Sequence, residues 1–185
     1  MKILYIHGLG ACFDIESPKC KALSTIGEVV GITIDYTLPY ITIDSMLQYI
    51  IYHENVDMIV GCSLGGYWTA EMGTRFRLPH VMLNPSTVPG ETLLAYADQI
   101  YTPYVGKPGL FKREEIEQYK AMPVGENGFT IVAKDDDIIP FEKTLGHLNS
   151  LSTVKIVPTG GHRLNNLAEF IEEIAAFYEK YQTII

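Results

Sequence analysis

Three short segments of the chain contain serine, aspartate and histidine in an arrangement that suits nucleophilic catalysis. Ser63 lies between Gly61 and Gly65, three consecutive aspartates occupy positions 135–137, and His162 follows two glycines. A serine hydroxyl is a poor nucleophile until a histidine removes its proton. The histidine in turn needs an acid that fixes its tautomer and stabilises the imidazolium. Together these residue types predict a serine that attacks a carbonyl carbon and forms an acyl-enzyme.

The pattern Gly61-x-Ser63-x-Gly65 is typical of a nucleophile elbow, a sharp turn from a strand into a helix. An apolar run at positions 57–60 precedes it, and a helix-like segment at positions 67–72 follows it. We expect a strained backbone at the serine, with its flanking glycines too close to their neighbours to bear side chains. The alternative for this segment is a glycine-rich turn that binds an anion.

The oxygen that becomes negative during such an attack needs two preorganised hydrogen-bond donors. We expect one to be the backbone N–H of Leu64, at the start of the elbow helix. The other would be the backbone N–H of Leu9, in the segment His7-Gly8-Leu9-Gly10. Gly8 would allow close approach. His7 is expected to be structural, anchoring this loop through hydrogen bonds.

Alternating apolar strands and amphipathic helices must position these groups. Continuous apolar runs separated by helical patterns predict βαβ units and a mostly parallel sheet of about six strands, with helices on both faces. Ligands of such sheets bind beyond the carboxyl ends of the strands, where the candidate residues fall. The predicted strands are residues 3–6, 29–34, 58–60, 80–83, 129–133 and 153–157. The predicted helices begin after Ser17 as N-cap, after Thr42 as N-cap, after the elbow and near Leu167.

Residues 87–127 form an insertion that is too long for an ordinary connection and rich in proline and glycine. We expect a small cap over one end of the sheet, with helical pieces at 91–99 and 113–121. Five aromatic residues either line an acyl pocket beneath this cap or simply pack there: Tyr36, Tyr40, Tyr101, Tyr104 and Phe111.

Composition excludes several classes of function. The 185 residues suit a single domain, and the net charge of −8 argues against a surface for nucleic acid or anionic membranes. No apolar run approaches membrane-spanning length and the N-terminus does not resemble a signal peptide, so the expected location is the cytoplasm.

No metal-ligand spacing and no phosphate loop are present, so neither a metal nor a cofactor is expected. The expected state is a monomer or a small homo-oligomer. The three cysteines (Cys12, Cys20, Cys62) are expected to be reduced, and three histidines (His53, His80, His147) are expected to be surface or capping residues.

The order serine, acid, histidine resembles that of the α/β-hydrolase superfamily. The chain is similar, along nearly its whole length, to the small bacterial esterases of the YqiA/YcfP type. The matching stretches are Leu4–Gly8, Ile59–Tyr67, Leu83–Pro85, Pro89 with Glu91–Leu94, Pro103-Tyr104 and Gly160–His162. This resemblance implies a compact α/β-hydrolase core without the first two strands of the full superfamily sheet. It also implies esterase or thioesterase activity on small or acyl-chain substrates.

The resemblance assigns roles residue by residue. Ser63 matches the nucleophile of the elbow, and His162 matches the base that follows paired glycines. The superfamily pattern Asp-x-x-Val-Pro fits Asp136–Pro140 and favours Asp136 as the acid. Asp135 stands where the family has glycine, which leaves Asp135 and Asp137 as alternatives.

The favoured function is therefore a serine hydrolase of ester or thioester bonds that needs no cofactor. Two alternatives use the same fold: a catalytically silent binding protein, and an acyltransferase that passes the acyl group to an acceptor other than water. The sequence does not identify the acyl group, because pocket shape sets that choice.

Overall fold

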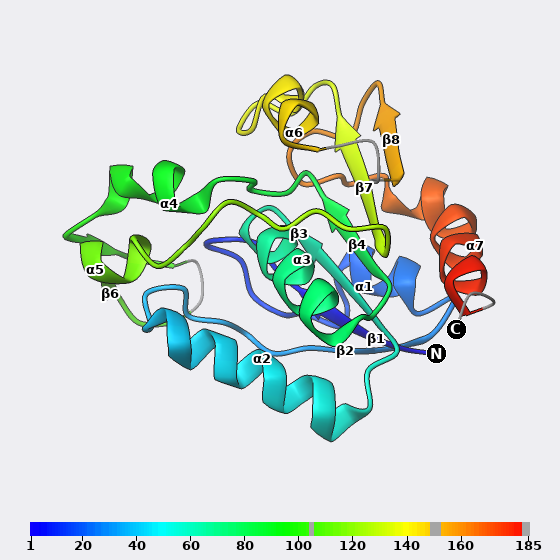
Figure 1. Cartoon of the computed structure of the whole chain (residues 1–185), viewed down its shortest axis with the longest axis horizontal. Helices are drawn as coiled ribbons and strands as arrows, with labels where there is room; N and C mark the ends of the chain where they lie inside the picture. Colours follow the sequence, from blue (N-terminus) through cyan, green and yellow to red (C-terminus); the bar gives the residue numbers. More distant parts are fainter. Residues whose placement is uncertain (104–105, 149–152, 183–185) are drawn as a thin grey trace.

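A single parallel sheet forms the centre of the molecule (Figure 1). The structure is a computed structural model that describes residues 1–103, 106–148 and 153–182. Six strands lie in the order β2-β1-β3-β4-β7-β8, and every neighbouring pair is parallel. Their bounds are β1 (Lys2–Ile6), β2 (Glu28–Val30), β3 (Met58–Cys62), β4 (His80–Leu83), β7 (Gly128–Ala133) and β8 (Thr153–Val157). The six predicted strands and their parallel arrangement are confirmed.

Helices cover both faces of the sheet and produce three layers. Alternate residues of each strand point to opposite faces, so Leu4 and Ile6 pack into one apolar core while Ile3 and Tyr5 pack into the other. The first core includes α2 (Tyr40–Glu54) and α3 (Leu64–Phe76). The second includes α1 (Pro18–Leu23), the 3₁₀ turn η2 (Leu167–Phe170) and α7 (Ile171–Gln182). A further helix, α6 (Phe141–His147), packs beside β7.

Two predicted boundaries are wrong, and long-range contacts explain both. The second strand ends at Val30 rather than Ile34, because the N–H of Ile34 donates to the ring of His7 instead of to a neighbouring strand. The second helix begins at Tyr40 with Pro39 as N-cap, which places Thr42 inside the first turn. The N–H of Tyr40 donates to the carboxylate of Glu115 at 2.8 Å, so this helix end needs no threonine cap.

The insertion differs most from prediction. Instead of two longer helices it contains short turns around a two-stranded antiparallel hairpin. Its elements are α4 (Pro89–Thr92), η1 (Leu93–Tyr96), β5 (Gln99–Tyr101), β6 (Gly109–Phe111) and α5 (Arg113–Ile116). Figure 1 shows this green segment extending to one side of the sheet, close to the start of α2.

The insertion rests on the loop that follows β1. A Cβ atom at Gly10 would overlap the hydroxyl of Tyr101, so this hairpin tyrosine lies directly against that loop. Tyr36 and Phe111 are buried in the core, which is packing rather than an open pocket lining. Tyr40 is half-buried among other aromatic rings, and Tyr104 lies outside the described residues.

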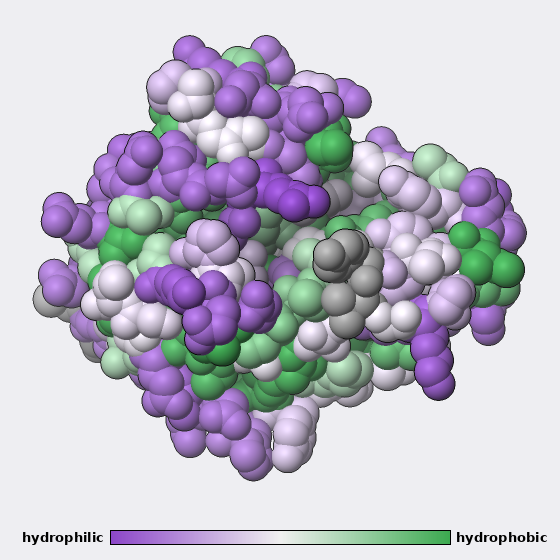
Figure 2. Space-filling model, turned by 180° about the vertical axis from the view of Figure 1, so that it is seen from behind, coloured by the Kyte–Doolittle hydropathy of each residue, from purple (hydrophilic) through white to green (hydrophobic). Residues whose placement is uncertain are grey.

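An open edge of the sheet lies at β2, bordered by a shallow apolar groove. Ile32, Tyr49 and Ile50 line it between β2 and the outer side of α2. Figure 2 shows apolar atoms gathered in the lower part of the face that is turned away in Figure 1. The lining of this groove includes none of the residues predicted to act in catalysis.

Candidate active site

Ser63 occupies a sharp turn between β3 and α3. Its backbone has φ 56° and ψ −122°, a conformation that side-chain-bearing residues rarely adopt. A Cβ atom at Gly61 would overlap Thr69 and the backbone of Gly65. One at Gly65 would overlap the carbonyl oxygens of Ile6 and His7. The turn therefore requires both glycines of the Gly-x-Ser-x-Gly pattern.

The strand order changes direction beside this serine. The chain passes from β1 to β2 on one side and then to β3 on the other, so the loops after β1 and β3 diverge. Gly8, in the loop after β1, lies directly across from Ser63. A Cβ atom at Gly8 would lie 3.0 Å from the Ser63 Cβ and 3.7 Å from its Oγ. Leu9 is the next residue, so its backbone amide comes directly after this contact along the chain. Leu64 is the first residue of α3, so its N–H has no acceptor within the helix.

His7 fixes the backbone of the loop after β1. It is buried, with an exposed fraction of 1%. Its Nε2 lies 2.8 Å from the backbone nitrogen of Ile34, and its Nδ1 lies 2.8 Å from the carbonyl oxygen of Gly8. The carbonyl oxygen of His7 accepts a 2.5 Å hydrogen bond from the hydroxyl of the buried Tyr36.

These partners determine the protonation of His7. A backbone N–H is only a donor, so Nε2 must accept, and Nδ1 must carry the proton that it donates to Gly8. Burial lowers the pKa of the His7 imidazole, which favours this neutral form. The carbonyl of Gly8 and the N–H of Leu9 belong to one planar peptide and point in opposite directions. The N–H of Ala11 also donates to the carbonyl of Gly8, at 3.2 Å. Together with this bond, His7 holds the carbonyl of Gly8 and so sets the direction of the Leu9 N–H.

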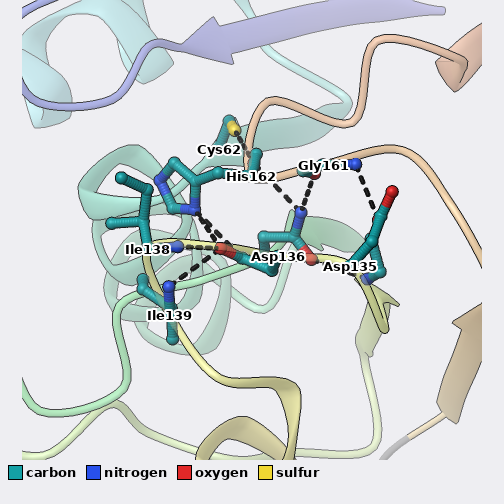
Figure 3. A network of polar contacts seen from close by, with 9 residues as sticks. Cys62, Asp135, Asp136, Ile138, Ile139, Gly161 and His162 are labelled. Carbon is teal, nitrogen blue, oxygen red and sulfur yellow. Dashed lines mark hydrogen bonds and ion pairs between the residues drawn. The ribbon is translucent and has the colours of Figure 1, made fainter.

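His162 and Asp136 form a close pair at the ends of β8 and β7. The Nδ1 atom of His162 lies 2.9 Å from both carboxylate oxygens of Asp136 (Figure 3). Asp136 Oδ1 also accepts the backbone N–H groups of Ile138 at 2.9 Å and Ile139 at 2.8 Å. The Asp136 side chain is almost fully buried, whereas that of His162 is 16% exposed. A carboxylate at Nδ1 places the proton there and leaves Nε2 free to accept one.

The three consecutive aspartates have different surroundings. The carboxylate of Asp135 accepts the N–H groups of Gly160 at 3.2 Å and Gly161 at 2.8 Å, on the loop that leads to His162 (Figure 3). Asp137 is exposed to solvent. Among the three, Asp136 has its carboxylate against the imidazole.

Asn84 is a site residue whose role sequence reasoning did not assign. Buried at the end of β4, it donates from Nδ2 to the carbonyls of Gly161 at 2.9 Å and His162 at 3.0 Å. Its Oδ1 accepts the N–H of Ala133 at 2.8 Å. The side chain thus joins three strand ends beneath the histidine loop. The available signal was an asparagine directly after a strand, a residue type that tolerates the positive φ of 42° found here.

The backbone of His162 lies next to the elbow. Cys62, the residue before Ser63, is buried, and its thiol lies 3.8 Å from the carbonyl oxygen of His162. No hydrogen bond between the Ser63 hydroxyl and His162 is present among the described residues. Hydrogen bonds of this kind are often long without substrate and shorten when the reacting groups assemble.

The other histidines lie apart from this site. His53 is exposed and stacks on Tyr49, and His147 contacts the carbonyl of Met122 at 2.6 Å. His80 is buried, contrary to its expected surface position, although its ring contacts the carbonyl of Leu78 as a cap would. The ranges 1–103, 106–148 and 153–182 contain no group of three or more acidic, histidine or cysteine residues placed to hold a metal ion. No helix in these ranges is both long and apolar enough to cross a membrane.

Comparison with known proteins places the chain among relatives of similar length. The UPF0227 protein of Shewanella loihica is 23% identical over 186 residues, covering 96% of this chain and 99% of that protein. The UPF0227 protein of Pasteurella multocida is 24% identical over 191 residues, covering 96% and 99%.

Solved structures with a similar fold include esterases. Est1E from Butyrivibrio proteoclasticus superposes with a TM-score of 0.71 at 14% identity, covering 98% of this chain and 88% of that one. Mouse alpha/beta hydrolase domain-containing protein 10 gives a TM-score of 0.69 at 13% identity, covering 100% and 90%. At such identities the likeness establishes the α/β-hydrolase fold, as the sequence predicted. A model of the uncharacterised protein family UPF0227 matches residues 2–179, and the chain belongs to that family.

Proposed function

We propose that this protein is a serine hydrolase that cleaves carboxylic esters or acyl thioesters through an acyl-enzyme. The principal support is the His162–Asp136 pair, with Nδ1 against a buried carboxylate, together with a serine in elbow geometry whose neighbour Cys62 contacts the backbone of His162. Ser63 is the nucleophile, His162 the general base and Asp136 the acid that orients the imidazole. No cofactor takes part.

The reaction proceeds in two balanced halves. The Ser63 hydroxyl gives its proton to His162 Nε2 while its oxygen bonds to the substrate carbonyl carbon. The bond to the leaving oxygen or sulfur then breaks, and that atom takes the proton from His162. Water repeats the sequence on the acyl-enzyme and releases the acid. In both halves the backbone N–H groups of Leu9 and Leu64 donate to the negative oxygen.

A fluorophosphonate probe tests the nucleophile directly. Wild-type protein should be labelled stoichiometrically at Ser63, and Ser63→Ala should abolish labelling and ester hydrolysis. Ser45→Ala, at an exposed serine of α2, is the matched control and should behave as wild type. Wild-type protein that resists the probe and leaves a chain-length panel of activated esters and acyl-CoAs intact would instead indicate a binding protein.

Hydrolysis and acyl transfer share the acyl-enzyme and differ in the acceptor. Adding an alcohol or an amine to a hydrolysing sample distinguishes them. A hydrolase should continue to release mainly free acid, whereas an acyltransferase should convert most of the acyl group into the new ester or amide.

A further inference from the structure

Ile138 has a position that the proposed reaction does not yet use. Its backbone N–H donates to Asp136 Oδ1 at 2.9 Å, and the same oxygen accepts His162 Nδ1 at 2.9 Å. The Ile138 backbone and the imidazole therefore meet at one oxygen atom. In the view of Figure 3 the Ile138 side chain is directed away from Asp136, on the same side as the imidazole.

This side chain is apolar and exposed, and the backbone that carries it is held in place. It is 66% exposed, although single exposed apolar residues are ordinary on protein surfaces. Ile138 differs from such residues because its backbone is hydrogen-bonded to the site. Two hydrogen bonds from Ile138 and Ile139 to the Asp136 carboxylate fix the backbone of this turn. The isoleucine therefore presents an apolar side chain from a fixed backbone position near the base.

The chemistry decides which part of a substrate would meet this surface. His162 gives its proton to the leaving oxygen or sulfur, so whatever is bonded to that atom lies beside the imidazole. The acyl chain instead extends from the carbonyl carbon that Ser63 attacks. The oxygen of that carbonyl faces the N–H groups of Leu9 and Leu64. A side chain next to His162 thus contacts the leaving group rather than the acyl chain.

We propose that Ile138 is a specificity-determining residue that contacts the leaving group, and that the preferred substrates carry an apolar group on the departing oxygen or sulfur. This inference rests on the proposed function. It adds a substrate preference that the triad itself does not define.

Alkyl butyrates with methyl, butyl and hexyl alcohols test this preference. Wild-type kcat/KM should rise with alcohol length. Ile138→Ser should lower kcat/KM for hexyl butyrate by about three- to tenfold and that for methyl butyrate by less than about twofold, since one partly exposed contact is removed. The acyl series of p-nitrophenyl acetate, butyrate and hexanoate should keep its wild-type ratios. Ile156→Ser, at an exposed isoleucine of β8, is the control and should leave both series unchanged.

An unchanged hexyl-to-methyl ratio in Ile138→Ser would overturn the inference, as would a change confined to the acyl series. Circular dichroism and the fluorophosphonate labelling rate establish that the variant is folded. Failure of the wild-type protein to hydrolyse any of these esters would contradict the proposed function itself, which keeps the two failures distinct.

Discussion

Two substitutions of His7 separate its two hydrogen bonds. In His7→Asn the side-chain amide can still donate to the carbonyl of Gly8, because asparagine Nδ2 corresponds in position to imidazole Nδ1. In His7→Gln the amide oxygen reaches the place of Nε2 and can accept the N–H of Ile34, but the bond to Gly8 is lost. If His7 sets the direction of the Leu9 N–H, only the glutamine variant should lose oxyanion stabilisation.

The expected magnitudes follow from burial. His7 is 1% exposed, so water does not replace a lost partner. His7→Asn leaves the N–H of the buried Ile34 without its acceptor, which should lower the free energy of unfolding by about 1–3 kcal/mol. His7→Gln should cost less, because the carbonyl of Gly8 still accepts the N–H of Ala11 at 3.2 Å. The loss of one oxyanion donor lowers the rate by about a hundred- to a thousandfold. We therefore expect kcat of His7→Gln to fall by up to that factor, with KM nearly unchanged, while His7→Asn stays within about tenfold of wild type.

Kinetics and stability must be measured together. p-Nitrophenyl butyrate gives kcat and KM. Urea unfolding followed by the fluorescence of Trp68, which is fully buried, gives the free energy of unfolding. Equal kcat values for the two folded variants would refute the positioning role, and so would a glutamine variant as active as wild type.

Three further perturbations concern residues around the site and the core. Asn84→Ala removes three hydrogen bonds and places alanine at positive φ, so it should cost about 2–5 kcal/mol of stability in urea and slow fluorophosphonate labelling. Burial lowers the pKa of His80 from 6.5 to about 4, so the unfolded chain binds the proton more tightly. Stability that is complete above pH 6.5 should therefore fall by about 3 kcal/mol towards pH 4 in urea titrations. The fall should be smaller in His80→Asn, and a fall of the same size there would contradict this assignment. Gly65→Ala should destabilise the fold by about 3 kcal/mol, because the new Cβ would overlap backbone oxygens. Gly146→Ala, in open space on α6, should instead raise Tm slightly. Equal Tm changes in the two variants would contradict the steric account.

Local patterns predicted the sheet because its strands are continuous apolar runs buried on both faces. Ser17 and Pro18 likewise marked the start of α1, where the Ser17 hydroxyl accepts the N–H of Cys20. The start of α2 was missed because Glu115, 75 residues away, satisfies the N–H of Tyr40. No pattern within one helix contains such a contact.

The insertion was mispredicted for a similar reason. Its apolar spacing near 91–99 suits a helix, yet Asp98 has φ 59° and donates its N–H to Phe111, which starts the hairpin. Pairing between β5 and β6 then overrides local helix propensity.

Sequence patterns predicted most residues of the candidate site but not the residues that hold its loops in place. Spacing identified Ser63, His162 and the aspartate triplet. Which aspartate contacts the imidazole, and which contacts the backbone of the histidine loop, depends on how two loops meet. The hydrogen bonds of Asn84 depend on three strand ends that lie close only in the fold.

The strained turn at Ser63 also links the proposed reactivity of this serine to folding. Its backbone conformation is unfavourable for an isolated serine and is held by the packing of α3 against the loop after β1, where Gly65 contacts the backbone of Ile6 and His7. A collapsed chain with formed helices but loose packing would relax this turn and withdraw the hydroxyl. Labelling of Ser63 during refolding should therefore appear only with the last, cooperative step, so the serine acts as a chemical reporter of the fully native state.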